Sequence, residues 1–65
     1  MTNLQRIRKQ SGLTQKQLAE QSGVNLQMVQ KYEQGTRNIN KACVTTTIKL
    51  AMTLKCNIAD ILEKE

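Results

Sequence analysis

The chain has 65 residues, with ten Lys or Arg, five Asp or Glu and no His, which gives a formal net charge of +5 at pH 7. A single Tyr is the whole aromatic content and there is no Pro, so the apolar core must come from aliphatic side chains, which favours an all-α fold. Two cysteines without histidine cannot complete a four-ligand zinc site, and no apolar run approaches the ~20 residues of a membrane span.

The charge is unevenly distributed along the chain. Residues 1–57 hold nine basic and two acidic side chains, whereas residues 58–65 hold Lys64 against three acids. A basic body indicates a polyanionic partner, and the acidic end should point away from it. The polar first twenty residues contain no secretory signal, so we expect a cytoplasmic protein with Cys43 and Cys56 reduced rather than paired. We expect residues 1–65 to form one domain without a metal or cofactor.

Residues 2–11 are predicted to form the first helix. Thr2 followed by Gln5 has the spacing of a capping box, and Leu4 and Ile7 lie at i and i+3 on an inward stripe. Arg8 follows directly at the inward edge. From spacing alone it is either solvated or engaged in an ion pair.

The segment 14–25 has the pattern of a helix, a tight turn and the start of a second helix. Thr14 and Gln17 form a capping box for a helix over residues 15–22. Gly23 stands where that helix must end in a left-handed conformation, and Asn25 can cap the next helix. The small Ala19 allows two helices to cross closely. This is the pattern of a helix-turn-helix, whose second helix enters the major groove of DNA.

The helix expected over residues 26–34 turns Val29 and Tyr32 inward. Five positions should project outward and are the candidate base-reading residues: Asn25, Leu26, Gln27, Gln30 and Lys31. A Gln amide matches the N7 and N6 edge of adenine, Lys31 can donate to guanine or to a phosphate, and an exposed Leu26 could touch a thymine methyl. The alternative is an ordinary solvated helix face.

Phosphate contacts are expected on both sides of that helix. The N-terminus of the helix over residues 15–22 offers unpaired backbone N–H groups and a positive dipole end, where Gln15 and Lys16 lie. The segment 34–38 at the end of the helix over residues 26–34 is rich in hydrogen-bonding side chains and contains one basic residue. The candidate phosphate contacts in it are Gln34, Thr36, Arg37 and Asn38.

Two further helices complete the chain. Asn40 is expected to cap a helix over residues 41–54 that turns inward Val44, Ile48, Ala51 and Leu54. Asn57 with Asp60 caps a short last helix. Its apolar Ile58 and Leu62, with Met52 nearby, suggest a weak homodimer contact.

These features together resemble the lambda-repressor and Cro-like helix-turn-helix family of bacterial and phage regulators. The resemblance rests on Leu13-Thr14-Gln15, Leu18-Ala19, Gly23-Val24, Val29 and Lys31-Tyr32-Glu33-Gln34-Gly35. It implies a compact five-helix domain that binds double-stranded operator DNA, reads bases through the third helix and contacts phosphates through Gln15 and the following loop. It also implies a structural ion pair between Arg8 and Glu33. The chain departs from the family after that loop, where Ile39 replaces a common Pro and about three extra residues precede the fourth helix.

The predicted function is therefore a DNA-binding transcriptional regulator, a repressor acting as a dimer on a pseudo-palindromic operator. The alternative is a protein-interaction module on the same fold, such as an antitoxin-like component. We do not expect an enzyme, because the sequence has no His and no arrangement that would activate a nucleophile. No small-molecule ligand or membrane partner is indicated.

Overall fold

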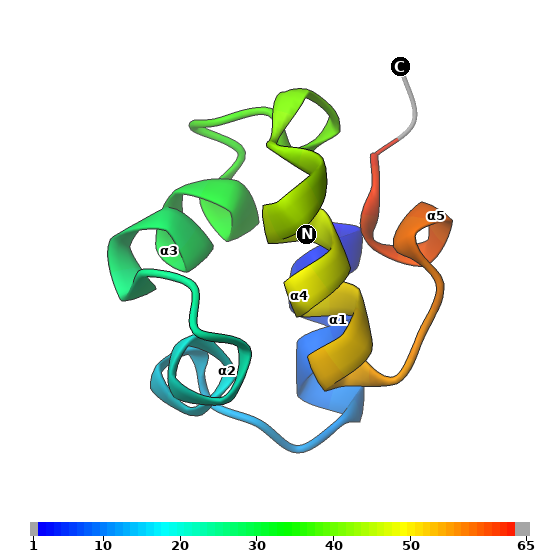
Figure 1. The fold of residues 1–65 in the computed structure, drawn as a ribbon. Coiled ribbons are helices and arrows are strands. Elements are labelled where there is room, and N and C mark those ends of the chain that lie inside the picture. The colour runs from blue at the N-terminus through cyan, green and yellow to red at the C-terminus, as the bar shows by residue number, and fades with distance from the viewer. Residues whose placement is uncertain (1, 64–65) are drawn as a thin grey trace.

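The computed structural model describes residues 2–63, in which five α-helices and a short 3-10 turn occur without any strand. Figure 1 shows the elements in chain order: α1 (Asn3–Gln10), α2 (Gln15–Ser22), α3 (Leu26–Gln34), the 3-10 turn η1 (Ile39–Lys41), α4 (Val44–Leu54) and α5 (Ile58–Ile61). The all-α, five-helix prediction is confirmed. Lys64 and Glu65 of the acidic end lie outside the described residues.

Local sequence signals set the ends of α2 and α3. The Thr14 hydroxyl accepts a hydrogen bond from the Gln17 backbone at 3.0 Å, and the Gln17 side chain accepts one from the Thr14 backbone at 2.9 Å, which is the predicted capping box. Gly23 ends α2 at φ 77°, a conformation that a side chain would strain. The Asn25 carboxamide oxygen then accepts from the Gln27 backbone at 2.7 Å and starts α3.

The start of α1 differs from the expected capping box. The Thr2 hydroxyl oxygen accepts from the Gln5 backbone at 3.3 Å, but within the described residues no return bond from the Gln5 side chain forms. The same hydroxyl instead donates to the Glu33 carbonyl at 3.2 Å, which joins the start of α1 to the end of α3. The Thr2 hydroxyl therefore caps α1 and makes a tertiary contact at the same time.

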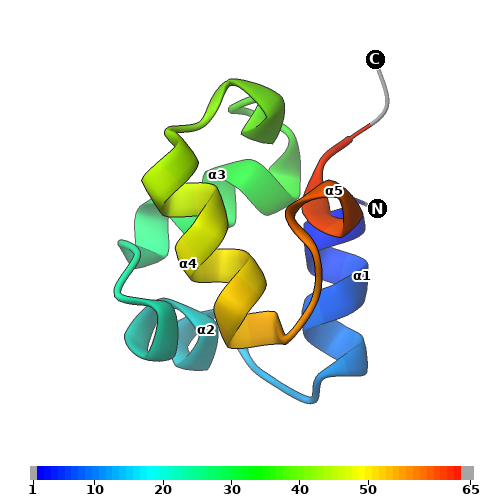
Figure 2. The same cartoon turned by 45° about the vertical axis from the view of Figure 1, so that its right-hand side comes forward.

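Figure 1 shows α4 in front of α1, with α2 and α3 to its left and α5 to its right, and Figure 2 shows α1 and α5 together on one side of α4. The helix α2 packs on α3 and α4, while α5 packs on α1 and α4. Every helix contributes to one core, whose fully buried side chains come from Leu4, Leu18, Val29, Leu50 and Ile61. The buried sides of α2 and α3 therefore pack on this core, which leaves their opposite sides at the surface.

The segment before α4 is a correction to the sequence prediction. The helix begins at Val44, not at residue 41, and Asn40 does not cap it. Ile39 is buried, so the chain must turn inward there, and it does so through η1, whose cap is the Asn38 side chain accepting from the Asn40 backbone at 2.9 Å. Asn40 instead exchanges two hydrogen bonds with the Glu63 backbone, at 2.6 and 2.9 Å.

The buried face of α4 is also a correction. The expected stripe included Val44 and Ile48, but both are exposed, and the side chains that α4 buries are Thr47, Leu50, Ala51 and Leu54. Thr47 is tolerated in the core because its hydroxyl donates to the Val44 carbonyl at 2.8 Å. The helix is continuous from Val44 to Leu54, including the three successive threonines at residues 45–47.

The C-terminal segment fastens both ends of the chain together. The predicted capping box of Asn57 and Asp60 is present and starts α5, which buries Ile61 completely. Beyond α5, the Glu63 carboxylate accepts from the Asn3 backbone at 2.7 Å, at the first turn of α1, where backbone N–H groups have no partner within the helix. Among the helices of residues 2–63, none is long and apolar enough to cross a membrane.

Candidate nucleic-acid interface

The outward face of α3 is an uninterrupted polar arc. Gln27, Lys31 and Gln34 are all exposed and follow one another at i, i+4 and i+7, so they line one side of the helix. Val29 and Tyr32 are buried on the opposite side and fix the rotation of α3 about its axis. Gln30 lies at the edge of the arc and is half-buried. The arc can donate and accept hydrogen bonds along about two turns.

The first residues of α3 are less free than the sequence suggested. Asn25 is exposed, but its carboxamide oxygen serves as the helix cap, so the NH₂ group is what it can offer to a ligand. Leu26 was expected to be exposed, and it is not: it is half-buried and packs against the hydrophobic core. Only an edge of its side chain remains at the surface.

The N-terminus of α2 lies beside the end of α3. Lys16 is exposed there. Gln15 is half-buried, and its side-chain nitrogen donates to Glu33 Oε1 at 3.0 Å. One side-chain N–H and the carboxamide oxygen of Gln15 therefore remain for a ligand, in an orientation set by α3.

The Arg8 and Glu33 side chains form a buried ion pair between α1 and α3. Arg8 Nε lies 2.7 Å from Glu33 Oε2, and Arg8 Nη2 lies 3.0 Å from Oε1, so the contact is bidentate. The Arg8 and Glu33 side chains are only 10% and 1% exposed. The remaining Arg8 nitrogen donates to the Leu13 carbonyl at 2.7 Å. Glu33 is thus neutralised within the fold and presents no negative charge to a ligand of α3.

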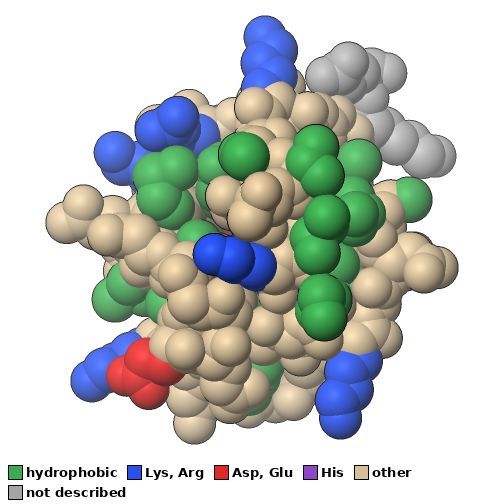
Figure 3. All heavy atoms as spheres, in the orientation of Figure 1, with side chains coloured by type: hydrophobic (Ala, Val, Ile, Leu, Met, Phe, Trp, Pro, Cys, Tyr) green, Lys and Arg blue, Asp and Glu red, His purple; other side chains and the backbone are tan. Residues whose placement is uncertain are grey.

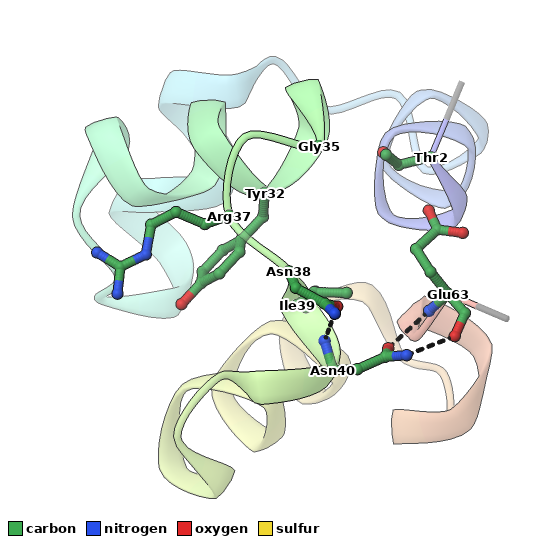
Figure 4. A pocket seen from close by; sticks show the side chains of 8 residues that line it. All are labelled: Thr2, Tyr32, Gly35, Arg37, Asn38, Ile39, Asn40 and Glu63. Carbon is green, nitrogen blue, oxygen red and sulfur yellow. Dashed lines mark hydrogen bonds between the residues drawn. The ribbon is translucent and has the colours of Figure 1, made fainter. Parts of the chain in front are cut away.

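The loop after α3 places a basic group next to that helix. Gln34, Thr36, Arg37 and Asn38 are all exposed. Figure 4 shows the Arg37 side chain extending away from Asn40 and Glu63, and its guanidinium lies 3.7 Å from the Met28 sulfur on α3. The hollow of about 280 Å³ drawn in Figure 4 separates this loop from the start of α1. Arg37 is therefore directed along the flank of α3.

Two residues at the end of this surface complete it. Gln34, predicted as a phosphate contact, is the last residue of α3, as the predicted helix over residues 26–34 has it, and lies on the same arc as Gln27. Lys41 was assigned to the fourth helix, but in η1 it lines a hollow of about 380 Å³ together with Met28 and Arg37.

The cysteines lie in different environments. Cys43 is exposed at the first turn of α4, where the backbone N–H and then the hydroxyl of Thr45, with the backbone of Thr46, hold the pKa of its thiol below the usual value. The thiol does not form a cap hydrogen bond of good geometry. Cys56 is half-buried and packs on the core, and burial, with a smaller effect of Asp60, raises its pKa. Both thiols are free.

Comparison with known proteins gives one finding. The sequence model of a helix-turn-helix family matches residues 4–61, which is most of the chain and includes α2, the turn and α3. Neither a curated protein nor a solved structure matches the chain.

Proposed function

The chain belongs to the lambda-repressor and Cro-like helix-turn-helix family of DNA-binding regulators, and from this premise we propose that it represses transcription from an operator read by α3. In this proposal α3 lies in the major groove, and two copies occupy a pseudo-palindromic site. Occupation of the operator blocks the access of RNA polymerase to the promoter.

The observation that carries the proposal is the polar arc of α3. Gln27, Lys31 and Gln34 stand clear of the protein along one side of a helix that the core holds at a fixed rotation. A Gln amide pairs with the N7 and N6 atoms of adenine, and a Lys donates to O6 and N7 of guanine. Gln30 and the NH₂ group of Asn25 extend the set at its edges, and the exposed edge of Leu26 suits a thymine methyl.

Phosphate contacts on either side of the arc would fix its register in the groove. On one side are Lys16 and the free N–H of Gln15, at the positive end of the α2 dipole. On the other side are the exposed residues at the end of α3 and in the loop that follows it, together with the basic side chain of Lys41. The former are Gln34, Thr36, Arg37 and Asn38. With Glu33 neutralised by Arg8, no free carboxylate of α3 opposes this placement.

A pseudo-palindromic operator follows from the small size of one reading surface. A single helix reaches only a few base pairs, and two copies related by a two-fold axis double the sequence read, with half-sites one helical turn apart, about 34–36 Å. Binding should weaken steeply with salt, since log K falls by ~0.9 for each phosphate neutralised by a basic side chain.

The experiment is selection of bound duplexes from a random pool, followed by titration of the selected operator and its single-base variants. Gln27→Ala should weaken binding to the selected operator by about 1–3 kcal/mol and relax the preference at one position in each half-site. The matched control is Gln10→Ala, which removes the same exposed side chain from the last turn of α1.

Two outcomes would contradict the proposal. If the selection enriches no sequence, the protein does not bind DNA sequence-specifically and the proposal is refuted. A Gln27→Ala protein with the wild-type preference at every position would show that α3 does not read bases. Repression itself is tested with a reporter gene carrying the selected operator within its promoter, where expression should fall when the protein is supplied.

A further inference from the structure

The surface between the loop after α3 and the first turn of α4 contains a hollow of about 380 Å³. Among the residues that line it are Tyr32, Arg37, Lys41, Cys43 and Thr46, and no acidic side chain of the described residues lines it. In Figure 3, Lys and Arg side chains stand at the upper left and the top of the molecule, where Figure 1 places the loop after α3 and η1, and no acidic side chain is visible among them. The hollow is therefore suited to an anionic group.

The Tyr32 hydroxyl opens into this hollow without a hydrogen-bond partner in residues 2–63. Tyr32 is only 5% exposed, and Figure 4 shows its hydroxyl at the end of the ring that lies away from Asn40 and Glu63. The hydroxyl oxygen is not sealed by protein, because no fully enclosed side-chain oxygen or nitrogen of the described residues lacks a partner. Buried tyrosine hydroxyls usually have a partner, so this one indicates a polar group that enters the hollow from outside.

The two basic side chains that line the hollow are available to bind an anion. Within residues 2–63 the ion pair of Arg8 with Glu33 is the only one, so the protein itself neutralises neither Arg37 nor Lys41. Arg37 donates to the Met28 sulfur at 3.7 Å, and a thioether is a weak acceptor. A guanidinium and an ammonium without acidic partners both favour carboxylate or phosphate oxygens.

Cys43 places a reactive thiol in the same hollow. Its side chain is exposed and lines the hollow together with Arg37 and Lys41. The backbone N–H of Thr45 is the main group that holds the pKa of this thiol below its usual value, so the nucleophilic thiolate forms more readily. Cys56 instead packs on the core and lines a separate hollow. Of the two thiols, only that of Cys43 is both exposed and next to basic groups that attract an anionic reagent.

We propose that Cys43 is a modification site, which forms a mixed disulfide with a small disulfide whose substituents carry carboxylates. The Cys43 thiolate attacks one sulfur of the reagent, the S–S bond of the reagent breaks, and its second sulfur leaves as a thiolate. Cys43 is thereby oxidised, the leaving sulfur is reduced, and the proton of the Cys43 thiol has passed to solvent. In the adduct the carboxylates bind Arg37 and Lys41, and an oxygen of the same group accepts a hydrogen bond from the Tyr32 hydroxyl.

The consequence for DNA binding rests on the proposed function. Arg37 and Lys41 are two of the proposed phosphate contacts, so an adduct in the hollow occupies the groups that a phosphate needs. Operator affinity should fall about 10-fold or more, and the slope of log K against log salt should decrease by about 1.8, since ~0.9 is lost for each of the two contacts. An excess of a small thiol reverses the exchange and restores both quantities.

The experiment treats the reduced protein with oxidised glutathione, a disulfide that carries carboxylates, and separately with the neutral bis(2-hydroxyethyl) disulfide. Peptide mapping by mass spectrometry measures the rate of modification of Cys43 by each reagent. The ratio of the two rates isolates recognition by the hollow, because the fraction of thiolate affects both reagents alike. In the folded protein this ratio should be about 5-fold higher than in denaturing urea, where the basic groups no longer surround the thiol.

Variants of the hollow test which groups recognise the reagent. Lys41→Ala and Arg37→Ala should each lower the rate ratio by about threefold, because a charge that attracts the carboxylates is lost. Tyr32→Phe keeps the buried ring, removes only the hydroxyl and should lower the ratio by about twofold. The matched control is Lys9→Ala, which removes an exposed basic side chain of α1 and should leave the ratio unchanged.

Operator titration then compares the reduced protein with its glutathione adduct. Cys43→Ser should bind the operator as tightly as the reduced wild-type protein and should lose all response to oxidised glutathione. Cys56→Ser should keep the response, because its thiol does not line this hollow.

Two results would overturn the inference. A rate ratio equal to that in urea, or one unchanged by Lys41→Ala and Arg37→Ala, would show that the hollow does not recognise the reagent. Equal operator affinities of the adduct and the reduced protein would show that the modification does not control DNA binding. Failure of the reduced protein to bind any operator would instead refute the proposed function, while the rate ratio would still report on the hollow.

Discussion

The side-chain amide of Gln15 donates a hydrogen bond to Oε1 of Glu33 at 3.0 Å, and the same oxygen accepts from Arg8 Nη2 at 3.0 Å. A residue at the start of α2 is thereby oriented by a buried carboxylate at the end of α3. The ion pair consequently has two effects. It joins α1 to α3, and it directs the remaining N–H of Gln15 toward the surface where we propose that a phosphate binds.

The first prediction concerns the stability of this ion pair. Glu33→Ala should lower the free energy of unfolding by about 3–5 kcal/mol, because it leaves the Arg8 guanidinium buried without its charge partner. Urea denaturation followed by circular dichroism measures the loss. The control is Glu20→Ala, an exposed acid whose removal should change stability by about 0.5 kcal/mol or less. A similar small effect of both substitutions would show that the pair is not important for stability.

The second prediction separates two kinds of phosphate contact by their dependence on salt. Arg37→Ala should weaken binding to all sequences and reduce the slope of log K against log salt by about 0.9, since one basic contact is lost. Gln15→Ala should also weaken all sequences alike but leave the slope unchanged, because a neutral amide releases no counterion. Titrations at several salt concentrations supply both slopes. Equal changes of slope in the two variants would exclude a neutral hydrogen-bonding role for Gln15.

The third prediction tests the rotation of α4. Leu50 is fully buried, so Leu50→Ala should destabilise the fold by about 2–5 kcal/mol. Ile48 is 38% exposed, so Ile48→Ala loses less buried surface than Leu50→Ala and should lower the free energy of unfolding by about 1 kcal/mol or less. The sequence pattern had instead assigned Ile48 to the core. Thermal unfolding of both variants gives the comparison. The reverse order of the two effects would mean that α4 is rotated from the orientation described here.

The fourth prediction concerns the two thiols. The backbone N–H of Thr45 lowers the pKa of Cys43, and the Thr45 hydroxyl and the Thr46 backbone N–H lower it further by smaller amounts. A larger fraction of this thiol is therefore ionised at pH 7 than of a cysteine with the usual pKa. The pKa of Cys56 is raised by burial and, less, by Asp60, so fewer thiolates form there. Iodoacetamide should therefore modify Cys43 first, and the reaction at Cys43 should reach its maximal rate at a lower pH.

Peptide mapping by mass spectrometry at successive times resolves the two sites. The control is the same reaction in denaturing urea, where the difference should largely vanish because both environments are lost. Equal rates in the folded protein would contradict the assignment.

Local motifs let the sequence predict the elements of this fold. The capping box at Thr14, the left-handed Gly23 and the cap at Asn25 each involve residues within four positions of one another, and all three are present. The box formed by Asn57 and Asp60 is present for the same reason. These signals depend on backbone geometry that a short segment defines by itself, so they do not require knowledge of the core.

The sequence could not assign faces where two readings were equally regular. On α4, the exposed line through Val44, Ile48 and Met52 has the same helical period as the buried side chains, so periodicity alone does not show which line faces the core. Packing against α2 and α5 decides it.

The sequence by itself therefore determined the class of fold, the helix-turn-helix and the family, because caps, turns and apolar spacing are properties of neighbouring residues. Only the tertiary structure decided that Leu26 packs inward, that Glu33 is shared by Arg8 and Gln15, and that η1 carries Ile39 into the core. Each of these depends on contacts between residues at least eighteen positions apart or on the packing of whole helices. Such contacts arise when the helices pack around one core, and no local pattern encodes them.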